Sequence, residues 1–215
     1  MTILDRLRAL RLVPVIVIDA PDDAVPLARA LAAGGLACAE VTFRTARAGE
    51  ALQRITAEVP ELLAGAGTVL TPQQAASARA AGAQFVVTPG FSEPVVEYCR
   101  SHDVPVYPGI ATPTEIEMAL RYDLRVLKFF PAEPLGGVAY LRAIAAPYGG
   151  VEFMPTGGIN ADNLGSYLGF DRVVACGGSW MAPGDWIKRK EFGRVREETE
   201  RAVAIAQGRA REKVS

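Results

Sequence analysis

The sequence predicts an α/β fold, a (β/α)8 TIM barrel with an additional N-terminal helix, formed as a single domain over residues 1–215. Short apolar segments alternate eight times with longer amphipathic segments, which is the pattern of parallel strands connected by helices. Polar residues and glycines follow several of the apolar segments. In a barrel of this class those positions meet at one end, where the chemistry takes place.

The expected strands are the nearly continuous apolar runs, which suit a parallel sheet covered by helices. They span residues 12–18, 36–43, 62–69, 84–88, 104–107, 124–130, 151–155 and 172–176. The expected helices begin at capping residues such as Thr71 and end at glycines such as Gly34 and Gly82. They span 22–33, 46–58, 72–81, 92–102, a segment that opens at 112–113, 137–146, 161–168 and an amphipathic run over 191–213. Residues 2–10 are expected to form the additional helix, which closes one end of the barrel.

An open, doubly wound sheet is the alternative arrangement of alternating strands and helices. A dinucleotide-binding sheet of that class needs a glycine-rich GxGxxG turn after its first strand. Residues 19–22 read DAPD instead. The barrel is therefore favoured.

Composition excludes several classes of partner. The net charge of −1 provides no basic surface for nucleic acid. Four charged residues interrupt the first twelve positions, and no apolar run reaches membrane-spanning length, so we expect a cytoplasmic protein with no signal peptide and no membrane partner. The three cysteines are widely spaced and His102 is the single histidine, so no metal, no cofactor and no histidine-based triad is expected.

Lys128 stands inside the apolar run 126–130, VLKFF. Side chains alternate along a strand, so Lys128 shares a face with Val126 and Phe130, and both faces are apolar. Burial disfavours the charged ammonium, and a neutral amine can attack a carbonyl carbon to form a Schiff base. The alternative interpretation is a lysine that reaches solvent along its aliphatic stem.

Other strand ends carry polar groups that would converge on this lysine. Glu40, Thr42 and Arg44 share one side of the second strand, and Thr68 ends the third. A glutamate and an arginine at a strand end can also form a merely structural ion pair. The turns after the seventh and eighth strands contain glycine pairs, at the usual phosphate site of such barrels, so we expect a phosphorylated small molecule as the partner.

Six motifs together resemble the 2-keto-3-deoxy-6-phosphogluconate (KDPG) aldolase family of class I, Schiff-base aldolases. They are EVTFRT at 40–45, GAGTVL at 65–70, VTPGF at 87–91, LKFFPAE at 127–133, PTGGI at 155–159 and GGSW at 177–180. The resemblance implies cleavage of KDPG to pyruvate and glyceraldehyde 3-phosphate, with possible side activity on 4-hydroxy-2-oxoglutarate. It also implies a homotrimer.

The resemblance assigns a role to each matching residue. Lys128 is implied as the Schiff-base lysine and Glu40 as the general acid and base. Arg44 and Thr68 are implied to bind the carboxylate, Pro89 and Phe130 to pack around the imine, and Thr156 to lie beside the sugar-acid chain. The implied phosphate-binding residues are Gly157, Gly158, Gly178 and Ser179.

Three alternatives remain open. Aldolases for the galactonate epimer share much of the pattern, but those known to us have an apolar residue where Thr156 stands, so Thr156 favours the gluconate. A phosphate-binding barrel isomerase would use the same glycine turns without a Schiff base. A non-catalytic phosphosugar-binding barrel would have no use for Glu40 and Lys128 at strand ends.

Overall fold

The structure is a computed structural model, and it describes residues 1–208. Its strands form two parallel sheets. The six-stranded sheet has the order β5 (Val106–Tyr107), β4 (Val86–Val87), β3 (Leu63–Gly67), β2 (Cys38–Thr42), β1 (Leu12–Ile16) and β9 (Cys176–Gly178). The three-stranded sheet has the order β6 (Gly109–Ile110), β7 (Val126–Phe129) and β8 (Glu152–Pro155). The expected α/β class with parallel strands is confirmed.

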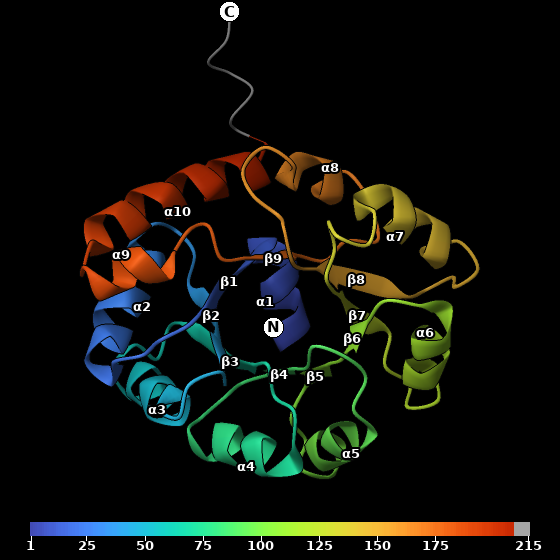
Figure 1. Cartoon of the computed structure of the whole chain (residues 1–215), viewed down its shortest axis with the longest axis horizontal. Helices are drawn as coiled ribbons and strands as arrows, with labels where there is room; N and C mark the ends of the chain where they lie inside the picture. The colour runs from blue at the N-terminus through green and yellow to red at the C-terminus, as the bar shows by residue number, and fades with distance from the viewer. Residues whose placement is uncertain (209–215) are drawn as a thin grey trace, which may run out of the picture.

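The helices form a ring around the strands (Figure 1). In chain order they are the short 3-10 helix η1 (Pro21–Asp23), then α2 (Ala24–Ala33), α3 (Ala48–Glu58), α4 (Pro72–Ala80), α5 (Glu93–Ser101), α6 (Pro113–Leu120), α7 (Gly137–Ala145), α8 (Leu164–Leu168), α9 (Gly184–Lys188) and α10 (Phe192–Ala206). Thr71 caps α4 as expected, accepting a hydrogen bond from the amide of Gln74. None of the helices described over residues 1–208 is long and apolar enough to cross a membrane.

Alternation along the strands separates the two faces as expected. On β2, Ala39 and Val41 pack into the core beneath α2 and α3, whereas Cys38 belongs to a different core on the opposite face. On β7, Leu127 and Phe129 pack outward against the surrounding helices. Glu40 and Lys128 are therefore both directed away from the helix layer.

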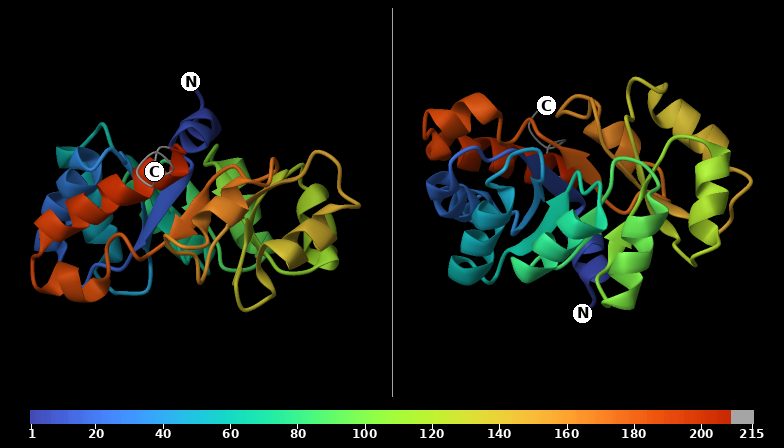
Figure 2. Two further views of the ribbon diagram at one scale, coloured as in Figure 1. Left: turned by 90° about the horizontal axis from the view of Figure 1, so that it is seen from above. Right: turned by 60° about the horizontal axis from the view of Figure 1, so that its bottom comes forward.

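The additional helix α1 (Ile3–Leu10) lies at one end of the strands (Figure 2). A capping box between Thr2 and Asp5 begins it. Leu7 is fully buried in a core to which both sheets contribute, including Val13 of β1 and Met154 of β8. The expectation that residues 2–10 close one end is thus confirmed.

Several elements are shorter than the sequence prediction, and three differ in arrangement. The expected fifth strand, 104–107, is reduced to β5 at Val106–Tyr107, and a short strand β6 that the sequence did not predict follows Pro108, which has no amide hydrogen to donate. Helix α8 begins at Leu164 instead of 161, because the Asn160 side chain accepts from the amides of Asp162 and Asn163 and holds a turn there. Strand β9 begins at Cys176, where its pairing with β1 starts.

The predicted helical run over 191–213 corresponds to α10, which ends at Ala206. Residues 209–213 of that prediction lie outside the described residues.

Candidate active site

Lys128 and Glu40 form a buried pair between the two sheets. The Lys128 side-chain nitrogen Nζ lies 3.3 Å from Glu40 Oε1 and donates a hydrogen bond to it. Lys128 is 5% exposed and Glu40 is 2% exposed. The expected burial of the lysine is therefore observed, and the alternative of a side chain reaching solvent is not. A buried amine beside a buried carboxyl group is costly to desolvate, and such pairs are frequent at functional sites.

Strand register fixes the position of each of the two residues within its own sheet. Glu40 of β2 is aligned with Val15 of β1 and with Gly65 of β3. Lys128 of β7 is aligned with Gly109 of β6 and Met154 of β8. The Phe130 ring lies beside the amine, with its centroid 5.3 Å from Nζ, so an apolar face flanks the nitrogen.

Gly67 provides the space for the Glu40 carboxyl group. A Cβ atom at position 67 would lie 2.1 Å from Glu40 Oε1. Any larger residue would displace the carboxyl group. Gly67 belongs to the GAGTVL motif, but the sequence assigns it no role, and its only signal there is that of a glycine inside a strand.

Arg44 and Thr68 approach each other beyond the ends of β2 and β3. Arg44 Nε donates to Thr68 Oγ1 at 3.3 Å. Thr68 has φ of 54°, a left-handed conformation that β-branched residues rarely adopt and that costs on the order of 1–3 kcal/mol. Such strain is concentrated at functional sites, which supports a functional interpretation of this strand end.

A cavity of about 470 Å³ opens beside these groups. The candidate residues that line it are Arg44, Phe130, Thr156, Gly157, Gly158, Gly178 and Ser179. Gly157 and Gly158 have φ of 102° and 81°, so both positions need the conformational freedom of glycine. The structure thus brings the two expected glycine turns together at one cavity.

Thr156 and Pro89 lie differently within the site. Thr156 forms a bridge with Gly177, where a Cβ would come within 2.3 Å of the threonine hydroxyl oxygen. Pro89 lines a smaller hollow of about 180 Å³ with Leu70 and Phe91, outside the lining of the large cavity. Its carbonyl group nevertheless approaches Gly109, the strand partner of Lys128.

Comparison with known proteins identifies the family to which this chain belongs. A sequence model of the aldolase family described as "KDPG and KHG aldolase" matches residues 3–197. The match includes both sheets and every candidate residue. The chain belongs to this aldolase family.

Relatives of the family align with nearly the whole chain. The 2-dehydro-3-deoxy-phosphogluconate aldolase of Treponema pallidum (strain Nichols) is 54% identical over 194 residues, which cover 90% of this chain and 92% of the relative. The structure of the KDPG aldolase of Legionella pneumophila, with pyruvate captured as a covalent carbinolamine intermediate, is 39% identical with a TM-score of 0.90 and covers 94% of this chain and 98% of that one.

A second solved aldolase contains a phosphorylated compound. The 2-keto-3-deoxy-6-phosphogluconate aldolase of Zymomonas mobilis ZM4 with 3-phosphoglycerate is 36% identical, with a TM-score of 0.87 over 94% of this chain and 95% of that one.

The aldolase also contains cavity residues that the sequence did not single out. Val15, Val17 and Trp180 line the large cavity. A Cβ at Gly178 would lie 1.8 Å from the Trp180 ring, so the indole packs directly on this glycine. The apolar run of the first strand and the GGSW motif contained these residues without any sign that they face a cavity.

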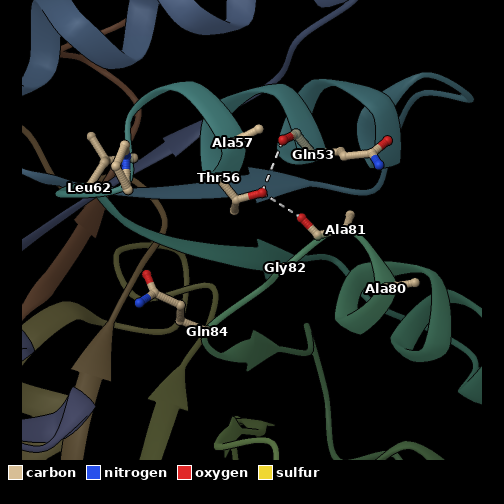
Figure 3. A pocket seen from close by; sticks show the side chains of 9 residues that line it. Gln53, Thr56, Ala57, Leu62, Ala80, Ala81, Gly82 and Gln84 are labelled. Atoms are coloured by element: carbon tan, nitrogen blue, oxygen red, sulfur yellow. Dashed lines mark hydrogen bonds between the residues drawn. The ribbon is translucent and has the colours of Figure 1, made fainter.

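A further hollow of about 410 Å³ lies between α3 and α4 (Figure 3). The Thr56 hydroxyl group lies within hydrogen-bonding distance of the carbonyl oxygens of Gln53 and Ala81 at its wall. Its described lining contains no ionisable side chain. Within residues 1–208, no cluster of three or more His, Cys, Asp or Glu side chains could hold a metal ion.

Proposed function

We propose that this member of the family is a class I aldolase, a carbon–carbon lyase that cleaves 2-keto-3-deoxy-6-phosphogluconate to pyruvate and glyceraldehyde 3-phosphate through a Schiff base on Lys128. The observation that carries the proposal is the buried contact of 3.3 Å between the Lys128 amine and Glu40. The family membership and the covalent pyruvate of the Legionella pneumophila aldolase support it.

Schiff-base formation begins at the C2 ketone of the substrate. Glu40 takes a proton from Lys128, which leaves a neutral amine whose lone pair attacks C2. The resulting carbinolamine loses water, with Glu40 donating the proton that the leaving hydroxyl needs. The positively charged iminium formed in this way is the electron sink of the reaction, so the reaction needs no metal.

Cleavage follows from the iminium. Glu40 takes the proton of the C4 hydroxyl, the C3–C4 bond breaks, and its electron pair moves toward the iminium nitrogen to form an enamine. Glyceraldehyde 3-phosphate leaves with the new C4 aldehyde. The enamine is then protonated at C3, and water hydrolyses the iminium to pyruvate and the free amine. One carboxyl group can serve these steps because it lies beside the nitrogen, directly or through one water molecule.

The remaining candidate residues hold the substrate. Arg44, with Thr68 beside it, binds the C1 carboxylate. Phe130 and Pro89 supply apolar packing near the imine, and Thr156 accompanies the hydroxylated chain. Gly157, Gly158, Gly178 and Ser179 bind the phosphate, for which backbone amides suffice as donors. The phosphoglycerate in the Zymomonas mobilis structure supports a phosphorylated substrate.

A single (β/α)8 barrel domain is proposed as the frame for this chemistry. Counting β5 and β6 as one strand interrupted at Pro108 gives eight strands. Support comes from the isolated bridges Phe153–Val173 and Thr156–Gly177, which connect β8 to the β9 region. A homotrimer is proposed from the family resemblance, and light scattering of the purified protein would measure it.

Two related substrates define the specificity question. 4-Hydroxy-2-oxoglutarate has the same keto acid group, and the family description includes its aldolase, so we propose side activity on it. Thr156 favours the gluconate over the galactonate epimer. Comparing kcat/KM for the two phosphorylated epimers tests this choice directly.

Borohydride reduction in the presence of pyruvate tests the proposed function. The expected product is a covalent adduct on Lys128, located by mass spectrometry, and no adduct in Lys128→Ala. A phosphate-binding isomerase or a non-catalytic barrel would give no adduct in the unaltered protein. Normal turnover by Lys128→Ala would refute the mechanism.

A further inference from the structure

The loop after β8 is held from behind by hydrogen bonds to three successive carbonyl groups. The donors come from the turn after β7 and from the residue before α8. The bonds are Ala132 N to Thr156 O at 2.8 Å, Glu133 N to Gly157 O at 3.0 Å, and Asn163 Nδ2 to Gly158 O at 3.1 Å. All three carbonyl groups are therefore directed away from the cavity that this loop lines.

This arrangement fixes the direction of the next three amide groups. In a trans peptide unit the N–H points opposite to the C=O. The N–H of Gly157 is directed toward Gly177, with which Thr156 forms a parallel bridge. The N–H groups of Gly158 and Ile159 are accordingly directed toward the cavity, and both residues line it. Among the described residues, neither of these two N–H groups has an acceptor. Successive amides of this kind form a concave binding site for an anion.

Asn163 holds the outer end of the loop. Its side-chain amide donates to Gly158 O, and its Oδ1 accepts from the amide of Asn160 at 2.9 Å. The two bonds clamp the loop on both sides of Ile159. Asn163 itself is outside the lining of the cavity, so it acts on the loop and not on the substrate.

Glu133 and Tyr167 hold the inner part of the loop. The Glu133 amide donates to Gly157 O, and its side chain packs so closely on Gly158 that a Cβ there would lie 2.6 Å from Glu133 Cβ. The Tyr167 hydroxyl group of α8 donates to the Glu133 carboxylate. Tyr167 is 1% exposed, and its burial, together with the hydrogen bond to Glu133, raises the pKa of the phenol, which remains a donor at neutral pH.

We propose that Asn163 and the Tyr167–Glu133 pair are positioning residues for the phosphate end of the substrate. They retain the carbonyl groups of Gly157 and Gly158 and thereby keep two amide donors, those of Gly158 and Ile159, directed into the cavity. This inference rests on the proposed function, because it assigns its residues to the phosphate subsite of that reaction. The reacting amine lies at the other end of the substrate, so these residues affect binding of the phosphate and leave imine chemistry unchanged.

The test compares Asn163→Ala and Tyr167→Phe with the unaltered enzyme. Each removes one hydrogen bond behind the loop, so KM for the phosphorylated keto acid should rise about three- to tenfold. Competitive inhibition by inorganic phosphate should weaken by a similar factor. The kcat and the rate of borohydride trapping with pyruvate, which has no phosphate, should stay within about twofold, because a misplaced loop weakens only uniform binding.

Tyr148→Phe is the matched control. Tyr148 also donates to a carboxylate, that of Glu117 at 3.0 Å, and both residues lie outside the cavity lining. The control should leave KM unchanged. If Asn163→Ala does not fold, Tyr167→Phe decides the question, since it keeps the buried ring.

Unchanged KM and phosphate inhibition in the folded variants would overturn the inference. So would a fall in pyruvate trapping equal to the fall in kcat/KM, which would indicate general damage to the site. Failure of the proposed function is distinguishable, because it would appear in the unaltered chain as the absence of pyruvate trapping.

Discussion

Gly67 offers a test of the acid–base assignment that leaves both reacting side chains in place. In Gly67→Ala the new methyl group would lie 2.1 Å from Glu40 Oε1 and 2.5 Å from its Cγ. Ordinary contact begins at 3.4 Å, so the carboxyl group must move by about 1.3 Å in a closely packed interior. The geometry of its contact with Lys128 then changes.

A misplacement of about 1 Å at a reacting centre can lower the rate by about 10²-fold. We therefore expect kcat for cleavage of the phosphorylated keto acid to fall by about that factor. The assay couples pyruvate release to NADH oxidation by lactate dehydrogenase. Borohydride trapping with pyruvate should still label Lys128, because the amine is untouched.

Gly49→Ala serves as the control for this substitution. A Cβ at Gly49 has nothing within 4 Å, and the residue lies in α3. It should leave kcat unchanged and raise stability by up to about 1 kcal/mol, since alanine is the better helix former. A folded Gly67→Ala enzyme with kcat within about threefold of the unaltered one would refute the role given to the Glu40 carboxyl group.

Four further predictions use independent features of the chain. Glu40→Gln should retain some pyruvate trapping at Lys128 while turnover falls about 10²- to 10⁴-fold; equal turnover would contradict the assignment. Activity should survive dialysis against EDTA, and its loss, restored by a divalent ion, would show a metal-dependent reaction. The three buried thiols should not react with a disulfide reagent at pH 8 until urea unfolds the chain, because burial raises the pKa of each, that of Cys99 to about 11. Folding thus favours the protonated thiols over the thiolates. The resulting contribution to the free energy of unfolding should be fully present below about pH 9 and should decline above that pH. A free energy of unfolding that rises between about pH 9 and 10.5 would contradict this prediction. Thr71→Ala should lower the free energy of unfolding in urea by about 1 kcal/mol without changing kcat, since it removes the N-cap of α4.

Periodicity predicted the parts of the fold in which one residue type repeats on one face. The run VLKFF placed Lys128 on the face opposite Leu127 and Phe129, and the structure agrees. Local side-chain bonding was not visible in the same way. The turn at Asn160, which delays the start of α8, depends on which backbone amides an asparagine side chain can reach.

In the candidate site, too, sequence patterns predicted some residues, whereas others became apparent only from contacts in the folded structure. The resemblance selected residues that the structure gathers at one cavity, such as Arg44 and Ser179. Gly67 and Asn163 contribute through contacts with residues distant in sequence or in a neighbouring turn. Gly67 has no Cβ and so leaves space for the Glu40 carboxyl group, and Asn163 donates a hydrogen bond to the carbonyl oxygen of Gly158. No pattern along the chain reports such contacts, because they depend on how two loops face each other after folding.

Helix α1 covers one end of the strands, where Leu7 is fully buried with Val13 of β1 and Met154 of β8. Arg44, Thr68 and Thr156 follow the opposite ends of β2, β3 and β8. Substrate and products are therefore expected to enter and leave at the end that α1 does not cover. In the proposed reaction the aldehyde fragment leaves first, because the pyruvate fragment stays bonded to Lys128 until water hydrolyses the iminium.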